Sequence, residues 1–81
     1  MSKNPKIELI KAIMQIEGNL TISSTGYNYD NKGGVLFRAY KKVDSNFENI
    51  SIAMDKSQVE AVNDCNSVLE IYDCYKEMEY F

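Results

Sequence analysis

The sequence predicts an α+β domain in the order α-β-β-β-α-α, with a three-stranded antiparallel sheet and helices packed on it. Apolar residues recur at helical spacing at both ends of the chain, and they alternate with polar residues in the middle. Clusters of Gly, Asn and Asp separate these segments. The 81 residues are 44% hydrophobic and 26% charged, enough for one core. We therefore expect residues 1–81 to form a single domain.

The first helix is expected to run from Pro5 to Glu17. Asn4 is a favourable N-cap, and a proline is well tolerated at the first helical position. Apolar side chains then recur at helical spacing, at positions 7, 10, 13 or 14, and 16. Gly18 is expected to end the helix in the left-handed conformation.

Three strands are expected between residues 20 and 54. The first begins with alternating residues 20–23, and the glycine-rich segment 26–34 follows as a turn or loop. The second covers residues 35–41, with alternate side chains on opposite faces. Its core-facing residues would be Val35, Phe37 and Ala39, and its outward residues Leu36, Arg38, Tyr40 and Lys42. After a turn at 44–46, the third strand covers residues 47–54, with Ile50, Ile52 and Met54 on one face.

The last third of the chain is predicted to form two helices, at about residues 56–64 and 68–79. Asp55 with Gln58, and Ser67 with Glu70, match the capping-box pattern. Poor helix formers at residues 63–67 separate the two helices. The second helix would direct one apolar stripe to the core: Val68, Ile71, Tyr72, Tyr75 and Met78.

The composition argues against an enzyme. The chain has no histidine, so the commonest general base and metal ligand is missing. The pair Gly33-Gly34 comes before a strand, which is not the position of a phosphate-binding loop. Cys65 and Cys74 fit no zinc-binding spacing and are expected to be reduced, partly buried thiols. We predict no catalytic residue, no metal, no cofactor and no small-molecule substrate.

The sequence also predicts a cytoplasmic protein. No segment has the apolar length of a signal peptide or a membrane span, so we do not expect a membrane as partner. The net charge of −3 weakly disfavours nonspecific binding to nucleic acid.

Charge is distributed unevenly along the chain. Residues 1–54 carry seven basic and five acidic groups, whereas residues 55–81 carry two basic and seven acidic groups. On a helical wheel Glu70, Asp73 and Glu77 lie opposite the apolar stripe, and Tyr80 extends their face. One interpretation is a solvated helix surface. The other is a binding surface whose carboxylates occupy phosphate positions on the Arg and Lys residues of a nucleic-acid-binding protein.

Two further surfaces are candidates for partner binding. The outward face of the second strand carries Arg38 and Tyr40, residue types that favour protein interfaces and also stacking on single-stranded nucleic acid. Tyr27 and Tyr29 are expected to be exposed and to offer rigid contact area. Alternatively, a helix covers the strand face or its residues simply face solvent, and the two tyrosines pack on each other.

The chain resembles small phage-encoded proteins, in particular anti-CRISPR inhibitors of type II CRISPR nucleases. The resemblance rests on composition and element order, and it runs through residues 8–13, 19–22, 35–38 and 55–81. It implies a non-enzymatic inhibitor that blocks a CRISPR-Cas or other nuclease complex in the bacterial host cell. The implied partner is a host protein or effector complex that binds nucleic acid, contacted by an acidic surface that resembles DNA in charge.

Two other functions compete with the inhibitor. A small nucleic-acid-binding or regulatory module would use Lys3, Lys6 and Lys11 together with Arg38, Tyr40 and Lys42. A homodimeric accessory protein would pair through an edge strand such as residues 20–25.

Overall fold

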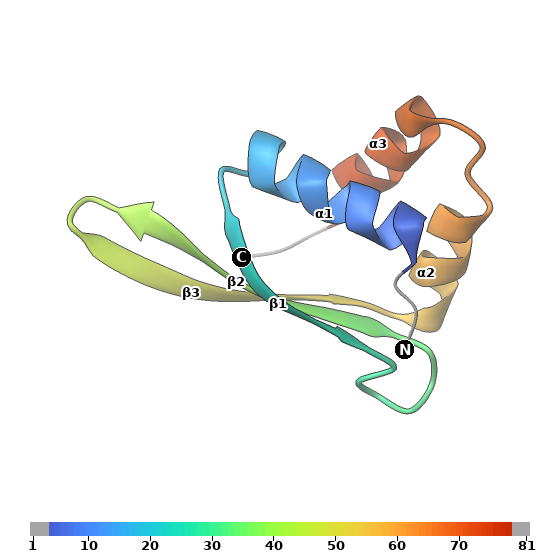
Figure 1. Cartoon of the computed structure of the whole chain (residues 1–81), viewed down its shortest axis with the longest axis horizontal. Helices are drawn as coiled ribbons and strands as arrows, with labels where there is room; N and C mark the ends of the chain where they lie inside the picture. The colour runs from blue at the N-terminus through green and yellow to red at the C-terminus, as the bar shows by residue number, and fades with distance from the viewer. Residues whose placement is uncertain (1–3, 79–81) are drawn as a thin grey trace.

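The computed structural model describes residues 4–78, and its elements follow the predicted order α-β-β-β-α-α (Figure 1). The helices are α1 (Pro5–Glu17), α2 (Lys56–Asn63) and α3 (Val68–Glu77). The strands are β1 (Thr21–Tyr27), β2 (Val35–Val43) and β3 (Asn46–Met54). β2 is central and antiparallel to both neighbours. The α+β fold with a three-stranded antiparallel sheet is therefore confirmed.

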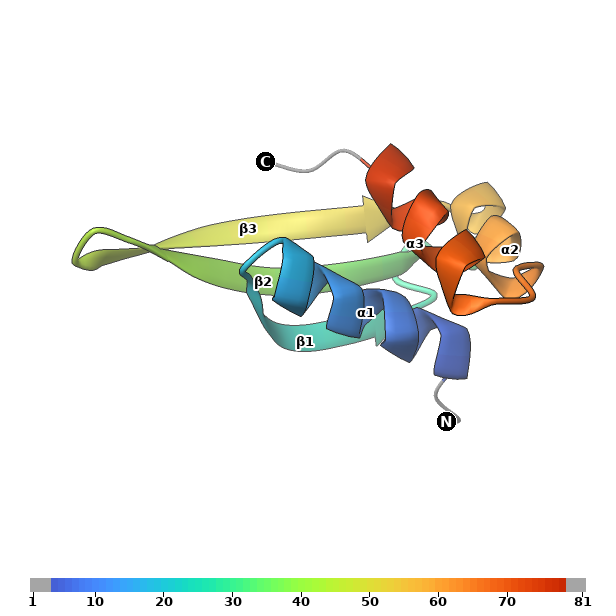
Figure 2. The ribbon, with the colours of Figure 1, turned by 90° about the horizontal axis from the view of Figure 1, so that it is seen from above.

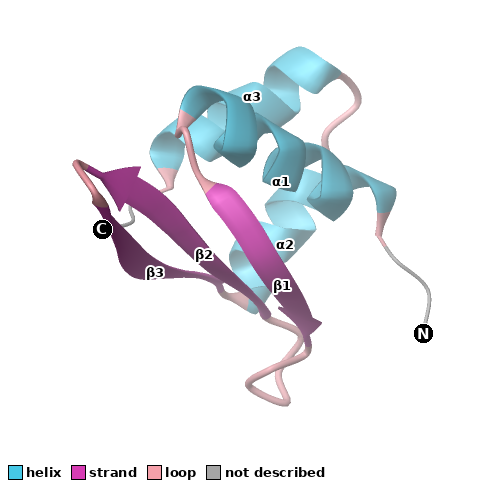
Figure 3. Ribbon diagram, turned by 60° about the vertical axis from the view of Figure 1, so that its left-hand side comes forward, coloured by secondary structure: helices cyan, strands magenta, loops and turns pink. Residues whose placement is uncertain are grey.

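The helices form one layer on one face of the sheet, and within residues 4–78 no helix covers the opposite face (Figure 2; Figure 3). The predicted alternation is confirmed, because the sheet buries Val35, Phe37, Ala39, Ile50, Ile52 and Met54. These side chains meet buried residues of all three helices: Ile7, Ile10, Met14, Val62 and Ile71. Full burial of a side chain such as Phe37 contributes about 1.5–3 kcal/mol, so this single interface is the main source of stability.

Local sequence sets the helix boundaries, with one exception. The Asn4 Oδ1 atom accepts hydrogen bonds from the backbone N–H groups of residues 6 and 7, and Asp55 and Gln58 form the predicted reciprocal capping box. The prediction that Gly18 adopts the left-handed conformation is wrong. Its φ is −87°, and its N–H still donates to the Met14 carbonyl. The chain reverses one residue later, at Asn19 with φ 54°.

α3 begins at Val68, as predicted, but the burial of its first turn differs from the prediction. Val68 was expected in the core stripe but is exposed, because α3 begins at the far side of the helical layer, away from the sheet (Figure 1). The buried part of α3 begins at Ile71. The Ser67 Oγ atom accepts the Glu70 N–H as expected, but the Glu70 carboxylate accepts from the Asn66 N–H. The first bond of the capping box is therefore present, and only the bond to the Glu70 carboxylate comes from the preceding residue.

β2 and β3 continue as a two-stranded hairpin beyond the end of β1. Thr21 of β1 lies opposite Tyr40, whereas the β2–β3 pairing continues to Val43 opposite Asn46. Residues 41–48, which we call the hairpin arm, project past α1 (Figure 1). The arm gives the molecule its elongated extents of 39 × 29 × 21 Å.

The helices are short. They contain 13, 8 and 10 residues, whereas a helix that crosses a bilayer needs about 20 apolar residues. Within residues 4–78, none has the length and apolar composition of a membrane span.

Candidate functional site

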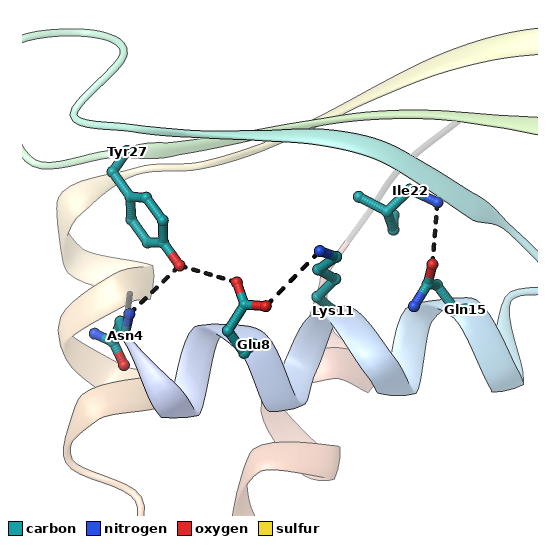
Figure 4. A network of polar contacts seen from close by, with 6 residues as sticks. All are labelled: Asn4, Glu8, Lys11, Gln15, Ile22 and Tyr27. Atoms are coloured by element: carbon teal, nitrogen blue, oxygen red, sulfur yellow. Dashed lines mark hydrogen bonds and ion pairs between the residues drawn. The ribbon is translucent and has the colours of Figure 1, made fainter. Parts of the chain in front are cut away.

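Tyr27 lies against α1, so its predicted place on an exposed surface is wrong. A β-bulge between Ile22 and Ser24 shifts the alternation of β1 by one residue, which turns Tyr27 toward the helices. Its hydroxyl donates to Glu8 Oε2 at 3.1 Å and accepts from the Asn4 N–H at 3.5 Å (Figure 4). Burial raises the pKa of Tyr27, and the Glu8 carboxylate adds to this against the opposite effect of the Asn4 N–H. Tyr27 therefore has a structural role.

A polar row on α1 faces the edge strand β1 (Figure 4). Lys11 Nζ lies 3.7 Å from Glu8 Oε1, and Gln15 Oε1 accepts the Ile22 N–H at 3.3 Å. An unpaired backbone N–H at the edge of a sheet is a site where another strand can add. Here the N–H of Ile22, beside the bulge, is already bonded to Gln15. Part of the edge considered for homodimer pairing, residues 20–25, is therefore occupied by α1.

Tyr29 belongs to a loop that is held by its own side chains. Asn28 Oδ1 accepts the Gly33 N–H at 2.8 Å, and Asp30 Oδ1 accepts the N–H groups of residues 32 and 34. The bonds from residues 32 and 34 lower the pKa of Asp30. The exposed Tyr29 ring lies over Gly34, since a Cβ atom at Gly34 would be 2.9 Å from Tyr29 Cε1. The loop presents Tyr29 rigidly, but without Tyr27 beside it.

The predicted acidic residues of α3 are exposed, and two of them have local partners. Glu70 Oε2 accepts from the Asn66 N–H at 3.0 Å and from Ser67 Oγ at 3.3 Å. Asp73 pairs with Lys76 at 3.2 Å. We call Glu70, Asp73 and Glu77 the acidic face; Tyr80, predicted to extend it, lies outside the described residues. Two of its carboxylates already stabilise α3 itself.

Aromatic and basic side chains gather on the uncovered face of the sheet. Phe47 is 65% exposed, and its ring meets that of Tyr40 edge to face, with centroids 5.5 Å apart at 89°. Arg38 and Lys42 are exposed on the same side of β2, on either side of Tyr40. We call these four residues the outer patch. The outward positions of the three described strands carry no carboxylate, so the patch is cationic.

A shallow hollow of about 360 Å³ adjoins the outer patch at Arg38. Its polar walls come from Ser23, Asn49 and Ser51 on the flanking strands. The Ser23 hydroxyl donates to the Arg38 carbonyl at 2.9 Å, which fixes the backbone of the bulge beside this arginine. Apart from Arg38, the residues that line the hollow are uncharged.

Sequence reasoning named Arg38 and Tyr40 but missed Phe47. The sequence did indicate it, because Ile50, Ile52 and Met54 share the core face. Strand alternation then places the odd-numbered Phe47 on the opposite, outward face. A two-residue turn between Val43 and Asn46 then places Phe47 opposite Lys42 and diagonal to Tyr40.

The lysines of α1 do not join the outer patch, so the cluster expected for a nucleic-acid-binding module does not form. α1 lies on the other side of the sheet (Figure 2). Lys6 Nζ donates to the carbonyls of Asn63, the last residue of α2, and of Cys65 just after it, each at 2.6 Å. Lys11 pairs with Glu8, and Lys3 precedes the described part of the chain.

Comparisons with known proteins give no family assignment. No protein-family model, curated protein or solved structure matches this chain. The outer patch and the acidic face are therefore the features from which a function is inferred.

Proposed function

We propose that this chain is a non-enzymatic inhibitor or adaptor that binds a protein partner through the outer patch. The observation that carries the proposal is the Tyr40–Phe47 ring pair on a face that no described helix covers. Tyr and Arg are enriched among the residues that contribute most to protein binding. An exposed phenylalanine beside them provides apolar area that a partner would remove from water.

The chemistry of the outer patch supports one kind of partner surface. Arg38 and Lys42 flank the ring pair, so the complementary surface carries carboxylates around an apolar centre. A protein is favoured over nucleic acid, because the chain has a net charge of −3 and the α1 lysines lie on the other layer. The resemblance to phage-encoded inhibitors gives the proposal its specific form, in which the partner is an effector or nuclease complex of bacterial defence.

The acidic face supports a second mode of binding to the same class of partner. Glu70, Asp73 and Glu77 follow one side of α3 at spacings of three and four residues. Such a row suits the basic groove of a nucleic-acid-binding complex. The outer patch ranks first, because Glu70 and Asp73 already have partners within α3.

A capture experiment with three variants separates the two modes. The outer-patch variant is Tyr40→Ser with Phe47→Ser, and the acidic-face variant is Asp73→Lys with Glu77→Lys, which keeps the Glu70 cap. The control is Leu69→Ser, which removes another exposed apolar side chain from α3. Each tagged protein is incubated with a bacterial host lysate, and the bound proteins are identified by mass spectrometry.

The proposal predicts that wild type, control and acidic-face variant retain one common partner that the outer-patch variant loses. Loss in the acidic-face variant alone would support the second mode and contradict the first. Equal capture by all four proteins would contradict both. When the partner is a nuclease complex, the wild type should also block its DNA cleavage in a purified assay.

A further inference from the structure

We propose that Cys65 and Cys74 form a modification site, at which a peroxide converts the two thiols into an intramolecular disulfide. They are the two cysteines of the chain, and both are free thiols in the structure. Their Sγ atoms lie 3.6 Å apart, although the residues belong to different segments: Cys65 to the α2–α3 connection and Cys74 to α3. The bond would fasten this connection to the body of α3.

The geometry requires only a small movement. A disulfide bond is about 2.0 Å long, so the two sulfur atoms must approach by about 1.5 Å. Cys65 lies outside regular secondary structure, where its backbone can adjust without breaking a helix. Cys74 is held in α3, so the connection moves toward the helix.

The hydrogen bonds orient the two sulfur atoms for this reaction. The Cys65 thiol donates to the Ala61 carbonyl at 3.2 Å. The two sulfur atoms are also in hydrogen-bonding contact with each other, in which either thiol can donate. Burial, reinforced by this contact, raises the pKa of Cys74 to about 11. Cys74 is thus a protonated thiol at neutral pH, and because the thiolate is the reactive form, it reacts only when the oxidant is in excess.

The surroundings decide which thiol reacts first. Cys74 lines a cavity of about 70 Å³ between β3, α2 and α3, whose walls include Met54 and Val62. This volume admits a molecule slightly larger than water, such as hydrogen peroxide. Cys65 is only 6% exposed. Cys74 is therefore the attacking thiol, and Cys65 is the thiol that closes the bond.

The reaction balances with hydrogen peroxide as the oxidant. The Cys74 thiolate attacks one peroxide oxygen, the O–O bond breaks, and the products are a sulfenic acid and, with the thiol proton, one water. The Cys65 sulfur then attacks the sulfenic sulfur, the S–O bond breaks, and a second water leaves as the disulfide forms. Two thiols lose two electrons and two protons in total, and the peroxide becomes two waters.

Peptide mapping of the full chain tests the proposal. After treatment with hydrogen peroxide, digestion by a glutamate-specific protease releases residues 61–70 and 71–77, each with one cysteine and no methionine. We expect the two peptides to be joined, and to separate on reduction. The chain-entropy model for so short a loop also predicts a rise in Tm on the order of 10 °C.

Single variants provide the controls. Cys65→Ser should stop at the sulfenic and sulfinic acids of Cys74, and Cys74→Ser should leave the buried Cys65 unmodified. The proposal is overturned when wild-type peptides remain separate, when Cys74 over-oxidises without a bond to Cys65, or when the disulfide joins two chains. The wild-type mapping decides the question even where a serine variant fails to fold.

Discussion

At the scale of single residues, the available space decides what the chain tolerates. A Cβ atom at Gly34 would lie 2.8 Å from both the Met54 carbonyl oxygen and Asp30 Oδ2, whereas at Gly26 the nearest atom is 3.9 Å away. Neither glycine has a positive φ, so the two sites differ in packing rather than in backbone strain.

We predict that Gly34→Ala lowers the free energy of unfolding by about 1–3 kcal/mol through overpacking. Gly26→Ala should be neutral or slightly stabilising, because alanine reduces the entropy of the unfolded chain. Urea unfolding followed by circular dichroism measures both. Equal urea midpoints for the two variants would contradict the prediction that a Cβ atom at Gly34 overpacks its surroundings.

The Cys74 thiol makes stability depend on pH in the alkaline range. Burial and the contact with Cys65, with smaller effects of Glu77 and Asp73, raise its pKa to about 11, whereas an unfolded thiol titrates near 8.5. Between these two pKa values the unfolded chain binds fewer protons than the folded chain. The stability that the Cys74 thiol contributes is therefore complete below about pH 8.5 and is lost as the pH rises to about 11.

We therefore expect the stability advantage of wild type over Cys74→Ser to shrink between pH 8 and pH 10.5. Lysines and tyrosines titrate in both proteins, so the comparison isolates the thiol. Unfolding by urea across this range provides the measurement. Parallel stability curves would contradict a raised pKa at Cys74.

At the scale of elements, Asn4 connects α1 to α2. Its Oδ1 atom caps α1, and its Nδ2 atom donates to Asn63 Oδ1 at 2.7 Å. We predict that Asn4→Ala costs about 1 kcal/mol of stability. Asn4→Asp should cost less, because a carboxylate keeps the cap and the Asn63 amide can turn its NH₂ group toward it. Thermal unfolding ranks the two variants, and a larger loss for Asn4→Asp would refute the capping role.

The elements that could be predicted are those whose signals are local. Asn4 before Pro5, and Asp55 with Gln58, carry the capping chemistry within one turn, and the alternation of β2 and β3 identified their core faces. The direction of Tyr27 could not be predicted. It depends on a bulge within residues 22–24, where the polar sequence Ser23-Ser24-Thr25 gives no apolar alternation that reveals the shift.

The candidate site was predictable only in part, for the same reason. The sheet face on which Arg38, Tyr40 and Phe47 lie follows from the alternation of their neighbours along the strand, so it can be predicted from the sequence. The hydrogen bonds from Lys6 to the carbonyls of Asn63 and Cys65, and the approach of Cys65 to Cys74, join residues that meet only in the folded chain.

At the scale of the whole molecule, the two candidate binding surfaces lie on different layers and differ in charge. The outer patch is cationic and aromatic on the open face of the sheet, and the acidic face belongs to the helical layer. This separation lets one partner surface be tested without disturbing the other. Because the outer patch also lies away from the core, its variants should fold normally.

Binding of the partner through the outer patch is tested most directly by affinity measurements with purified proteins. The captured partner is titrated with wild type, with Leu69→Ser and with the variant that carries Tyr40→Ser and Phe47→Ser. Loss of a hot spot of about 2 kcal/mol corresponds to a roughly 30-fold weaker Kd. We predict a loss of at least this size for the outer-patch variant, with no change for Leu69→Ser and matched thermal unfolding. A Kd for the folded outer-patch variant equal to that of wild type would show that the partner does not bind through the outer patch.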